Sequence, residues 1–194
     1  MAKTFMISTF NGLIQAVSLG DYHRYWLDKS AKRKNPAFDR HSGYILSLKE
    51  PNSRGRGQAI RYFSEQVSQH LSSTRLGVAQ ILIIPRAEAG EVSEGMEEVV
   101  KSVCKTDPRF SYVRNALRRH TSVAKLAHGG SRSMAVHLES IEYRSSVRAP
   151  LVKILLDDVA TSGQSMAGCV ALLHAHDISA RMVQCLVLGR TADD

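Results

Sequence analysis

From about residue 80 onward, apolar residues fall into short blocks with two different spacings. The runs 80–84, 151–156 and 180–188 are almost continuously apolar and of strand length, which is typical of strands buried on both faces. Between them, a capping residue at Ser93 followed by Glu94, Glu97 and Glu98 predicts a helix as far as about Cys104. Apolar positions three and four residues apart predict a second helix over 164–176. Strands separated by helices predict an α/β fold, a Rossmann-like parallel sheet with helices on both faces.

The first half of the chain is patterned less regularly. Apolar and other residues alternate over 42–49, which predicts a strand, and a polar loop over 51–57 leads into a helix predicted over 58–72. We therefore expect two parts: residues 1–75 as an N-terminal extension or hood packed on the core, and residues 76–194 as the core.

Two further segments complete this pattern. Residues 113–133 hold many arginines, lysines and histidines together with Gly129 and Gly130, which predicts a mobile loop. The following segment, 134–141, is expected to form another strand.

Composition places the chain among ordinary globular proteins. Hydrophobic residues make up 43% of it and charged residues 23%, and no window approaches the ~18 apolar residues that span a membrane. The amino-terminal segment does not have the pattern of a signal peptide. We read Cys104, Cys169 and Cys185 as reduced, mostly buried thiols rather than a metal site or a reactive nucleophile. A cytoplasmic protein without a membrane span is therefore expected.

The net charge of +8 changes the picture in one respect. Basic charge attracts phosphates, nucleic acid or an acidic membrane face, and the charge alone does not choose among them. No recognisable nucleic-acid motif occurs, and aromatic residues do not interleave with the basic ones. We therefore do not expect a dedicated nucleic-acid-binding fold.

The segment 154–165 carries the most informative motif. An apolar strand leads to Asp157 and Asp158, then to a short hydroxyl-rich loop with Gly163, and then to a helix. A loop that enters a helix N-terminus offers backbone N–H groups and a positive dipole to a phosphate, and Thr161 and Ser165 add hydroxyl donors. The two carboxylates would repel a phosphate. They suit ribose hydroxyls, directly or through a divalent metal.

This motif resembles the signature of type I phosphoribosyltransferases, and every position of that signature is met. The tail 168–191 resembles the last helix and strand of the competence-protein-F-like branch, and the segment 116–132 resembles its flexible loop more loosely. The zinc ribbon common in that branch is missing. The resemblance covers about residues 78–191 and implies a variable hood, Mg²⁺ and phosphoribosyl pyrophosphate as the donor.

The resemblance also implies roles for particular residues. Ligand-binding positions are Pro85, Arg118, Arg119, Ala160, Thr161, Ser162, Gly163, Gln164 and Ser165. Catalytic positions are Arg86, Lys125, Arg132, Asp157 and Asp158, and the two aspartates double as metal ligands. Arg86 would meet the pyrophosphate, and the basic residues near the flexible loop would close over the donor. Each of these cations has the alternative of being a solvated surface charge.

Other residues carry weaker signals. Arg54 and Arg56 fit a solvated turn better than a phosphate or nucleic-acid contact. His120, His128 and His137 fit packed or surface histidines better than acid–base groups. His174 and His176 point in different directions on a helix and do not form a joint metal site. One departure from the family concerns the substrate. In 6-oxopurine salvage enzymes an aspartate occupies the position of Thr161, so salvage of hypoxanthine or guanine is not expected.

We therefore expect a magnesium-dependent transfer of phosphoribosyl to a nitrogen nucleophile, with release of pyrophosphate. The alternative is a non-catalytic nucleotide or donor sensor on the same fold, associated with nucleic acid or a protein partner through its basic surface. A homo-oligomer is left open, as is the acceptor.

Overall fold

The computed structural model describes residues 2–10, 12–123, 133–144, 150–176, 178 and 180–192. In chain order the elements are β1 (Lys3–Thr9), β2 (Gly12–Ser18), β3 (Asp21–Tyr22), β4 (Trp26–Asp28), β5 (Arg33–Lys34), α1 (Arg40–Lys49), α2 (Arg56–Ser73), β6 (Ala79–Ile83), α3 (Glu94–Thr106), β7 (Phe110–Tyr112), β8 (Leu117–Arg119), α4 (Met134–Ser140), β9 (Ile141–Tyr143), β10 (Val152–Ala160), α5 (Gln164–Ala175), a short 3-10 helix (Ala180–Met182) and β11 (Val183–Thr191).

Within these residues, seven strands form one mostly parallel sheet. Its order is β1-β2-β11-β10-β6-β7, and β3 pairs with β11 beyond the end of β2. Only β1 and β2 are antiparallel to each other. The interior strand β6, which lies between β10 and β7, is buried along its whole length, as expected of a strand covered on both faces.

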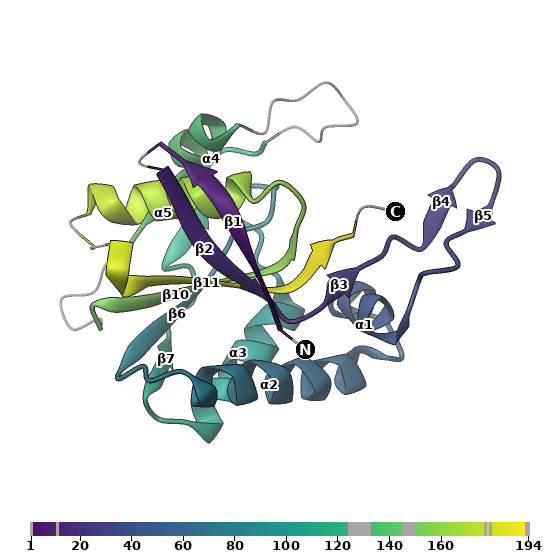
Figure 1. The fold of residues 1–194 in the computed structure, drawn as a ribbon, viewed down its shortest axis with the longest axis horizontal. Coiled ribbons are helices and arrows are strands. Elements are labelled where there is room, and N and C mark those ends of the chain that lie inside the picture. The colour runs from purple at the N-terminus through teal and green to yellow at the C-terminus, as the bar shows by residue number, and fades with distance from the viewer. Residues whose placement is uncertain are drawn as a thin grey trace.

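Helices cover both faces of this sheet (Figure 1). Apolar side chains of α1, α2 and α3 pack with one set of strand residues, and those of α4 and α5 pack with the alternate set. The predicted α/β architecture with a mostly parallel sheet between helices is therefore confirmed. Residues 1–75 supply β1 to β3 of the same sheet, the β4–β5 hairpin, and the helices α1 and α2.

Two predicted strands are helices. The segment 42–49 lies in α1, where the Asp39 side chain accepts a hydrogen bond from the Ser42 N–H at 2.8 Å and caps the helix. Ile45 and Leu48, three residues apart, form its buried face, so a helical spacing was hidden inside the apparent alternation. The segment 134–141 is mainly α4, which Ser133 caps through the Val136 N–H.

The predicted mobile loop over 113–133 is wrong in its first part. Leu117–Arg119 forms β8, which pairs antiparallel with β9, and Arg119 is buried. Residues 124–132, including Gly129 and Gly130, lie outside the described residues. No helix in the described part of the chain is long and apolar enough to cross a membrane.

Two glycines at equivalent helix positions give a test of this packing. A Cβ on Gly95 in α3 would overlap the carbonyl oxygen of Leu48 in α1, whereas a Cβ on Gly57 in α2 would meet nothing within 4 Å. We expect Gly95→Ala to lower the free energy of unfolding by about 1–3 kcal/mol because the two backbones must separate. Gly57→Ala should raise it by about 0.5 kcal/mol through helix propensity.

Urea denaturation of the two variants beside the unchanged protein measures both effects. Equal stability of the Gly95 and Gly57 variants would contradict the close contact between α1 and α3.

Candidate functional site

A cleft of about 560 Å³ lies at the carboxyl ends of the central strands. From β6 the chain continues to β7 on one side of the sheet, and β10 joins β6 on the other side, so the strand order reverses at this point. Ligands of open α/β sheets bind outside the carboxyl ends of the strands at such a reversal. The cleft is lined by Tyr22, Lys49, Ile83, Ile84, Pro85, Arg86, Ala87, Ser93, Met96, Arg119, His137, Asp157, Asp158, Val159, Thr161, Ser165 and Thr191.

The strand β10 places Asp157 and Asp158 at the cleft. Its pairing with β6 ends at Leu156, whose carbonyl accepts a hydrogen bond from the Ile84 N–H at 2.9 Å. From Asp157 onward β10 continues beside β11 only. This part of β10 therefore borders an open space on one side, where the earlier part of the strand, up to Leu156, is paired with β6.

Asp157 is a carboxyl whose surroundings disfavour its negative charge. Burial, reinforced by the negative charge of Asp158, raises the pKa of Asp157 to about 7. The Asp158 N–H donates to Asp157 Oδ1 at 2.8 Å, and this bond together with the charge of Lys49 opposes the rise in pKa. Asp157 therefore takes up or releases a proton near neutral pH.

Asp158 is held by a lysine that the sequence reasoning missed. Lys49 Nζ lies 3.2 Å from Asp158 Oδ1, and both side chains are half-buried. Lys49 is the last residue of α1 and also lies 5.9 Å from the centre of the Tyr22 ring. Because 42–49 was predicted as a strand, the approach of Lys49 to the second aspartate was not foreseen.

The loop from Thr161 to Ser165 turns sharply into α5. Gly163 is the N-cap residue with φ +75°, and a Cβ there would lie 2.9 Å from a side-chain carbon of Ile7. A residue other than glycine would meet both backbone strain and this clash. The N-terminal N–H groups of α5 and the hydroxyls of Thr161 and Ser165 lie at the cleft end of this loop. Thr161 Oγ1 lies 3.1 Å from the hydroxyl of Thr191, which ends β11.

The Ser165 side chain belongs to a hydrogen-bond network with the buried residues His137 and Arg119. The guanidinium of Arg119 lies 3.1 Å from Nδ1 of His137, and Nε2 of the same ring lies 3.3 Å from Ser165 Oγ. Arginine only donates, so Nδ1 accepts and the ring proton is on Nε2, which donates to Ser165. The Ser165 hydroxyl hydrogen then remains for an acceptor in the cleft.

Arg119 has other partners that fix its position. Its Nε donates to the carbonyl of Arg86 at 2.6 Å, and another guanidinium nitrogen donates to the hydroxyl of Ser140. Arg119 therefore ties the loop after β6 to α4. The Arg86 side chain is exposed at the cleft and pairs with Glu91 at 3.2 Å.

The cleft gathers seven of the predicted site residues: Pro85, Arg86, Arg119, Asp157, Asp158, Thr161 and Ser165. Five others do not line it. Ala160 and Gly163 are buried, Ser162 is exposed, Gln164 accepts from the Met134 N–H at 3.0 Å, and Arg118 lies 3.8 Å from Glu142. Lys125 and Arg132 lie outside the described residues.

The polar lining residues that were not predicted as site residues are Tyr22, Lys49, Ser93, His137 and Thr191. His137 is packed, as expected of it, but it also faces the cleft. Arg56, expected to be a solvated turn residue, pairs with Glu94 and Glu98 at 3.5 Å and 2.8 Å.

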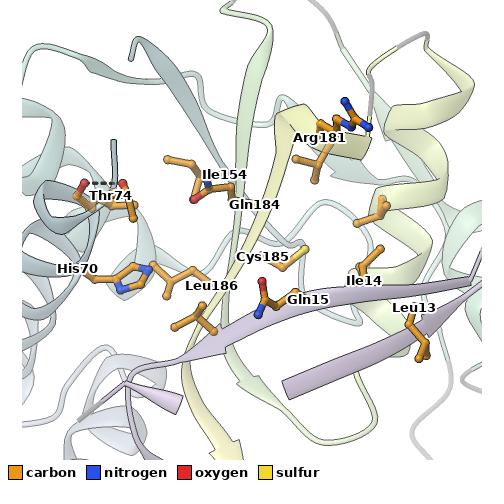
Figure 2. A pocket seen from close by; sticks show the side chains of 14 residues that line it. Leu13, Ile14, Gln15, His70, Thr74, Ile154, Arg181, Gln184, Cys185 and Leu186 are labelled. Atoms are coloured by element: carbon orange, nitrogen blue, oxygen red, sulfur yellow. Dashed lines mark hydrogen bonds between the residues drawn. The ribbon is translucent and has the colours of Figure 1, made fainter. Parts of the chain in front are cut away.

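A second cavity of about 470 Å³ lies at the opposite end of the sheet, where β2 and β11 separate. Figure 2 shows Gln15, His70 and Gln184 around it. It is lined by no carboxylate and by none of the predicted site residues. The chemistry of the motif therefore belongs to the first cleft.

The raised pKa of Asp157 predicts how stability depends on pH. Its folded-state pKa lies above the ordinary value of 3.8, so this group stabilises the fold at low pH and loses that contribution as pH rises toward about 7. The Asp157→Asn substitution removes the titrating carboxyl and therefore removes this loss of stability. The variant should therefore gain stability relative to the unchanged protein between about pH 5 and pH 8.

Urea unfolding at a series of pH values measures this difference. Asp28→Asn is the control, because hydrogen bonds from Ser30 and Ala31 lower the pKa of Asp28 and place its effect at more acidic pH. A stability difference for Asp157→Asn that stays flat over the range would contradict the raised pKa.

Comparison with known proteins adds no assignment to this geometry. No family model matches the chain, and no curated protein matches it in sequence. The arrangement of residues in the cleft is therefore the observation from which a function can be inferred.

Proposed function

We propose that this chain has the type I phosphoribosyltransferase fold, binds phosphoribosyl pyrophosphate with Mg²⁺ in the cleft, and transfers phosphoribosyl to a nitrogen nucleophile. One observation carries the proposal. A helix N-terminus with two hydroxyl donors and a pair of adjacent carboxylates line the same cleft at the reversal of strand order. The hydrogen-bond donors suit the phosphate of a phosphorylated sugar, and the carboxylates suit its hydroxyls or a bound cation.

The loop before α5 forms the phosphate end of the proposed site. The backbone N–H groups at the start of α5 have no partner within the helix, and the positive end of its dipole favours an anion. Thr161 and Ser165 add hydroxyls that line the cleft. The 5-phosphate is assigned to this end.

Asp157 and Asp158 form the ribose end. Carboxylate oxygens accept hydrogen bonds from vicinal hydroxyls and are also the ligands that Mg²⁺ prefers. No group of three or more metal-binding side chains occurs among the described residues. The two aspartates therefore fit an ion that also takes oxygens from the phosphorylated ligand, which is the usual way proteins bind Mg²⁺.

The loop after β6 forms the pyrophosphate end. Pro85, Arg86 and Ala87 line the cleft, and the exposed guanidinium of Arg86 is within reach of an entering anion if it leaves Glu91. In the proposed reaction the bond from the anomeric carbon to the pyrophosphate oxygen breaks and a bond to the acceptor nitrogen forms. Pyrophosphate leaves with the bonding electrons, and positive charge near it stabilises that change.

A second candidate function is binding without transfer. Of the four basic residues assigned to the closing loop, Arg118 lies outside the cleft and Arg119 is buried in hydrogen bonds to His137 and Ser140. Neither is placed to move over a bound donor. This observation favours a sensor of the donor or of a nucleotide.

Calorimetry tests both candidates. We expect phosphoribosyl pyrophosphate to bind the unchanged protein more tightly with Mg²⁺ than without it, because the aspartates then share the ion with the ligand. Asp157→Asn/Asp158→Asn should weaken binding with Mg²⁺ by at least about tenfold, the size of a lost hydrogen bond to a charged group.

Glu65→Gln/Glu139→Gln removes the same charge from exposed helix positions and should leave the affinity unchanged. Absence of binding by the unchanged protein would rule out both candidates. Release of pyrophosphate with a panel of nucleobases distinguishes them, since a sensor binds without releasing it.

The hydrogen bond between His137 and Ser165 predicts that substitutions at these two residues weaken the binding of phosphoribosyl pyrophosphate to different extents. Ser165→Ala removes a hydroxyl donor to the phosphate and should weaken binding about tenfold. His137→Ala leaves that hydroxyl without its orienting donor and should weaken binding by a smaller factor. His137→Gln retains an N–H donor and should recover part of the loss.

The Ser165→Ala/His137→Ala double variant provides the control for this network. If His137 acts only through Ser165, the double variant binds no more weakly than Ser165→Ala. Additive losses would show that His137 acts on the ligand by another route.

A further inference from the structure

The hairpin formed by β4 and β5 concentrates positive charge at one place on the molecule. Five of the eleven residues from Arg24 to Lys34 are lysine or arginine and one is aspartate, so this segment carries half of the chain's +8. Figure 1 shows the hairpin extending away from the layers of the fold, between β3 and α1. Its tip, from Lys29 to Lys32, is fully exposed.

The cations of this hairpin differ in their pairing from cations elsewhere in the fold. None of the five forms a salt bridge within the described part of the chain, whereas Lys49, Arg56, Arg86 and Arg109 elsewhere each do. The single acidic residue, Asp28, accepts from the Ser30 hydroxyl at 2.6 Å and the Ala31 N–H at 3.0 Å. Its charge therefore closes the turn and does not neutralise a lysine.

Aromatic rings lie at the base of the same hairpin, beside one of its cations. Tyr25 and Trp26 contact edge to face at 4.7 Å between centroids, and Phe38 meets Tyr25 at 5.0 Å in the same manner. Lys34 pairs with Trp26 across the hairpin, and its Nζ lies 5.4 Å from the Tyr25 ring. The three rings are half-buried and belong to neither of the two hydrophobic cores.

The expectation that aromatic residues do not interleave with basic ones is therefore wrong for this segment. Cations without carboxylate partners beside partly exposed rings match the needs of a single-stranded nucleic acid. Its phosphates take the charge and its bases stack on aromatic side chains. In a duplex the bases stack on one another, so their faces are less available for stacking on the aromatic side chains.

The exposed tip argues against a membrane as the partner. Its sequence is Lys29-Ser30-Ala31-Lys32, with no large apolar side chain to enter a bilayer. The rings lie at the base of the hairpin and pack against one another. We propose that the β4–β5 hairpin is a binding site for single-stranded nucleic acid, independently of the reaction proposed for the cleft.

Trp26 gives a direct measurement, because it is the only tryptophan in the chain. Titrating the full-length protein with thymidine and uridine oligonucleotides should quench its fluorescence to saturation, as stacking on a base does. Polyphosphate should bind without quenching. The two oligonucleotides also distinguish DNA from RNA as the tighter ligand.

Charge substitutions test the phosphate contacts. For Lys29→Gln/Lys32→Gln/Arg33→Gln, we expect the slope of log affinity against log salt to fall by about 2, at about 0.7 per contact with a single strand. The matched control is Arg61→Gln/Arg75→Gln/Lys105→Gln, which removes the same charge from exposed positions elsewhere and should keep the slope.

Ring substitutions test the stacking separately, using anisotropy of a labelled oligonucleotide. Trp26→Leu should weaken binding at least about fivefold, whereas Trp26→Phe keeps a ring and should lose less. Circular dichroism confirms that each variant is folded, so that a lost affinity reports the surface.

The inference would be overturned if neither oligonucleotide gave a saturable fluorescence change at low salt, or if both triple variants lost the same amount of salt slope. It would also be overturned if the protein bound a duplex more tightly than a single strand, or bound phosphatidylserine vesicles but not oligonucleotides.

Discussion

The strand β10 continues as far as Ala160, whereas its pairing with β6 stops at Leu156. Pro85 follows immediately after the last donor of that pairing, Ile84, and its ring fixes φ and removes an N–H, so the chain leaves the sheet there. The end of β10 thus keeps β11 as a neighbour on one side and loses β6 on the other. Both carboxylates and the loop that follows them border the space opened in this way, and the rest of the site is arranged around it.

The side chains around this space separate into two chemical ends. Asp158 pairs with Lys49, and burial together with the charge of Asp158 raises the pKa of Asp157, so the carboxylate end takes up a proton near neutral pH. The other end consists of N–H and O–H donors at the start of α5. Because His137 donates to Ser165, this donor end is fixed by a network that reaches back to Arg119 and the loop after β6. A ligand that bridges the two ends must present hydroxyls or a cation to one and an anion to the other.

How much of the site the sequence predicts depends on how local each part is. The strand, the aspartates and the loop into α5 are contiguous, and each step has its own signal, so their placement together was predictable. Lys49 and Arg119 come from segments whose local patterns mislead. In 42–49 the alternation of apolar residues hides the helical pair Ile45 and Leu48, and β8 has only three residues, too few to show a period. Their positions are set by the cap at Asp39 and by pairing with β9, neither of which a periodicity reveals.

The distribution of charge separates the two surfaces of the molecule. A net charge of +8 suggests an anion site, yet the cleft itself contains Asp157 and Asp158 beside Lys49, and its exposed cation, Arg86, pairs with Glu91. Selectivity in the cleft must therefore come from oriented donors at short range. The hairpin is the reverse case. Its cations are exposed and form no salt bridge within the described residues, so their field acts through solvent over about a Debye length. Such a field attracts a polyanion and weakens steeply with salt, whereas the contacts in the cleft should depend on salt much less. Salt dependence is accordingly the property that separates the two surfaces.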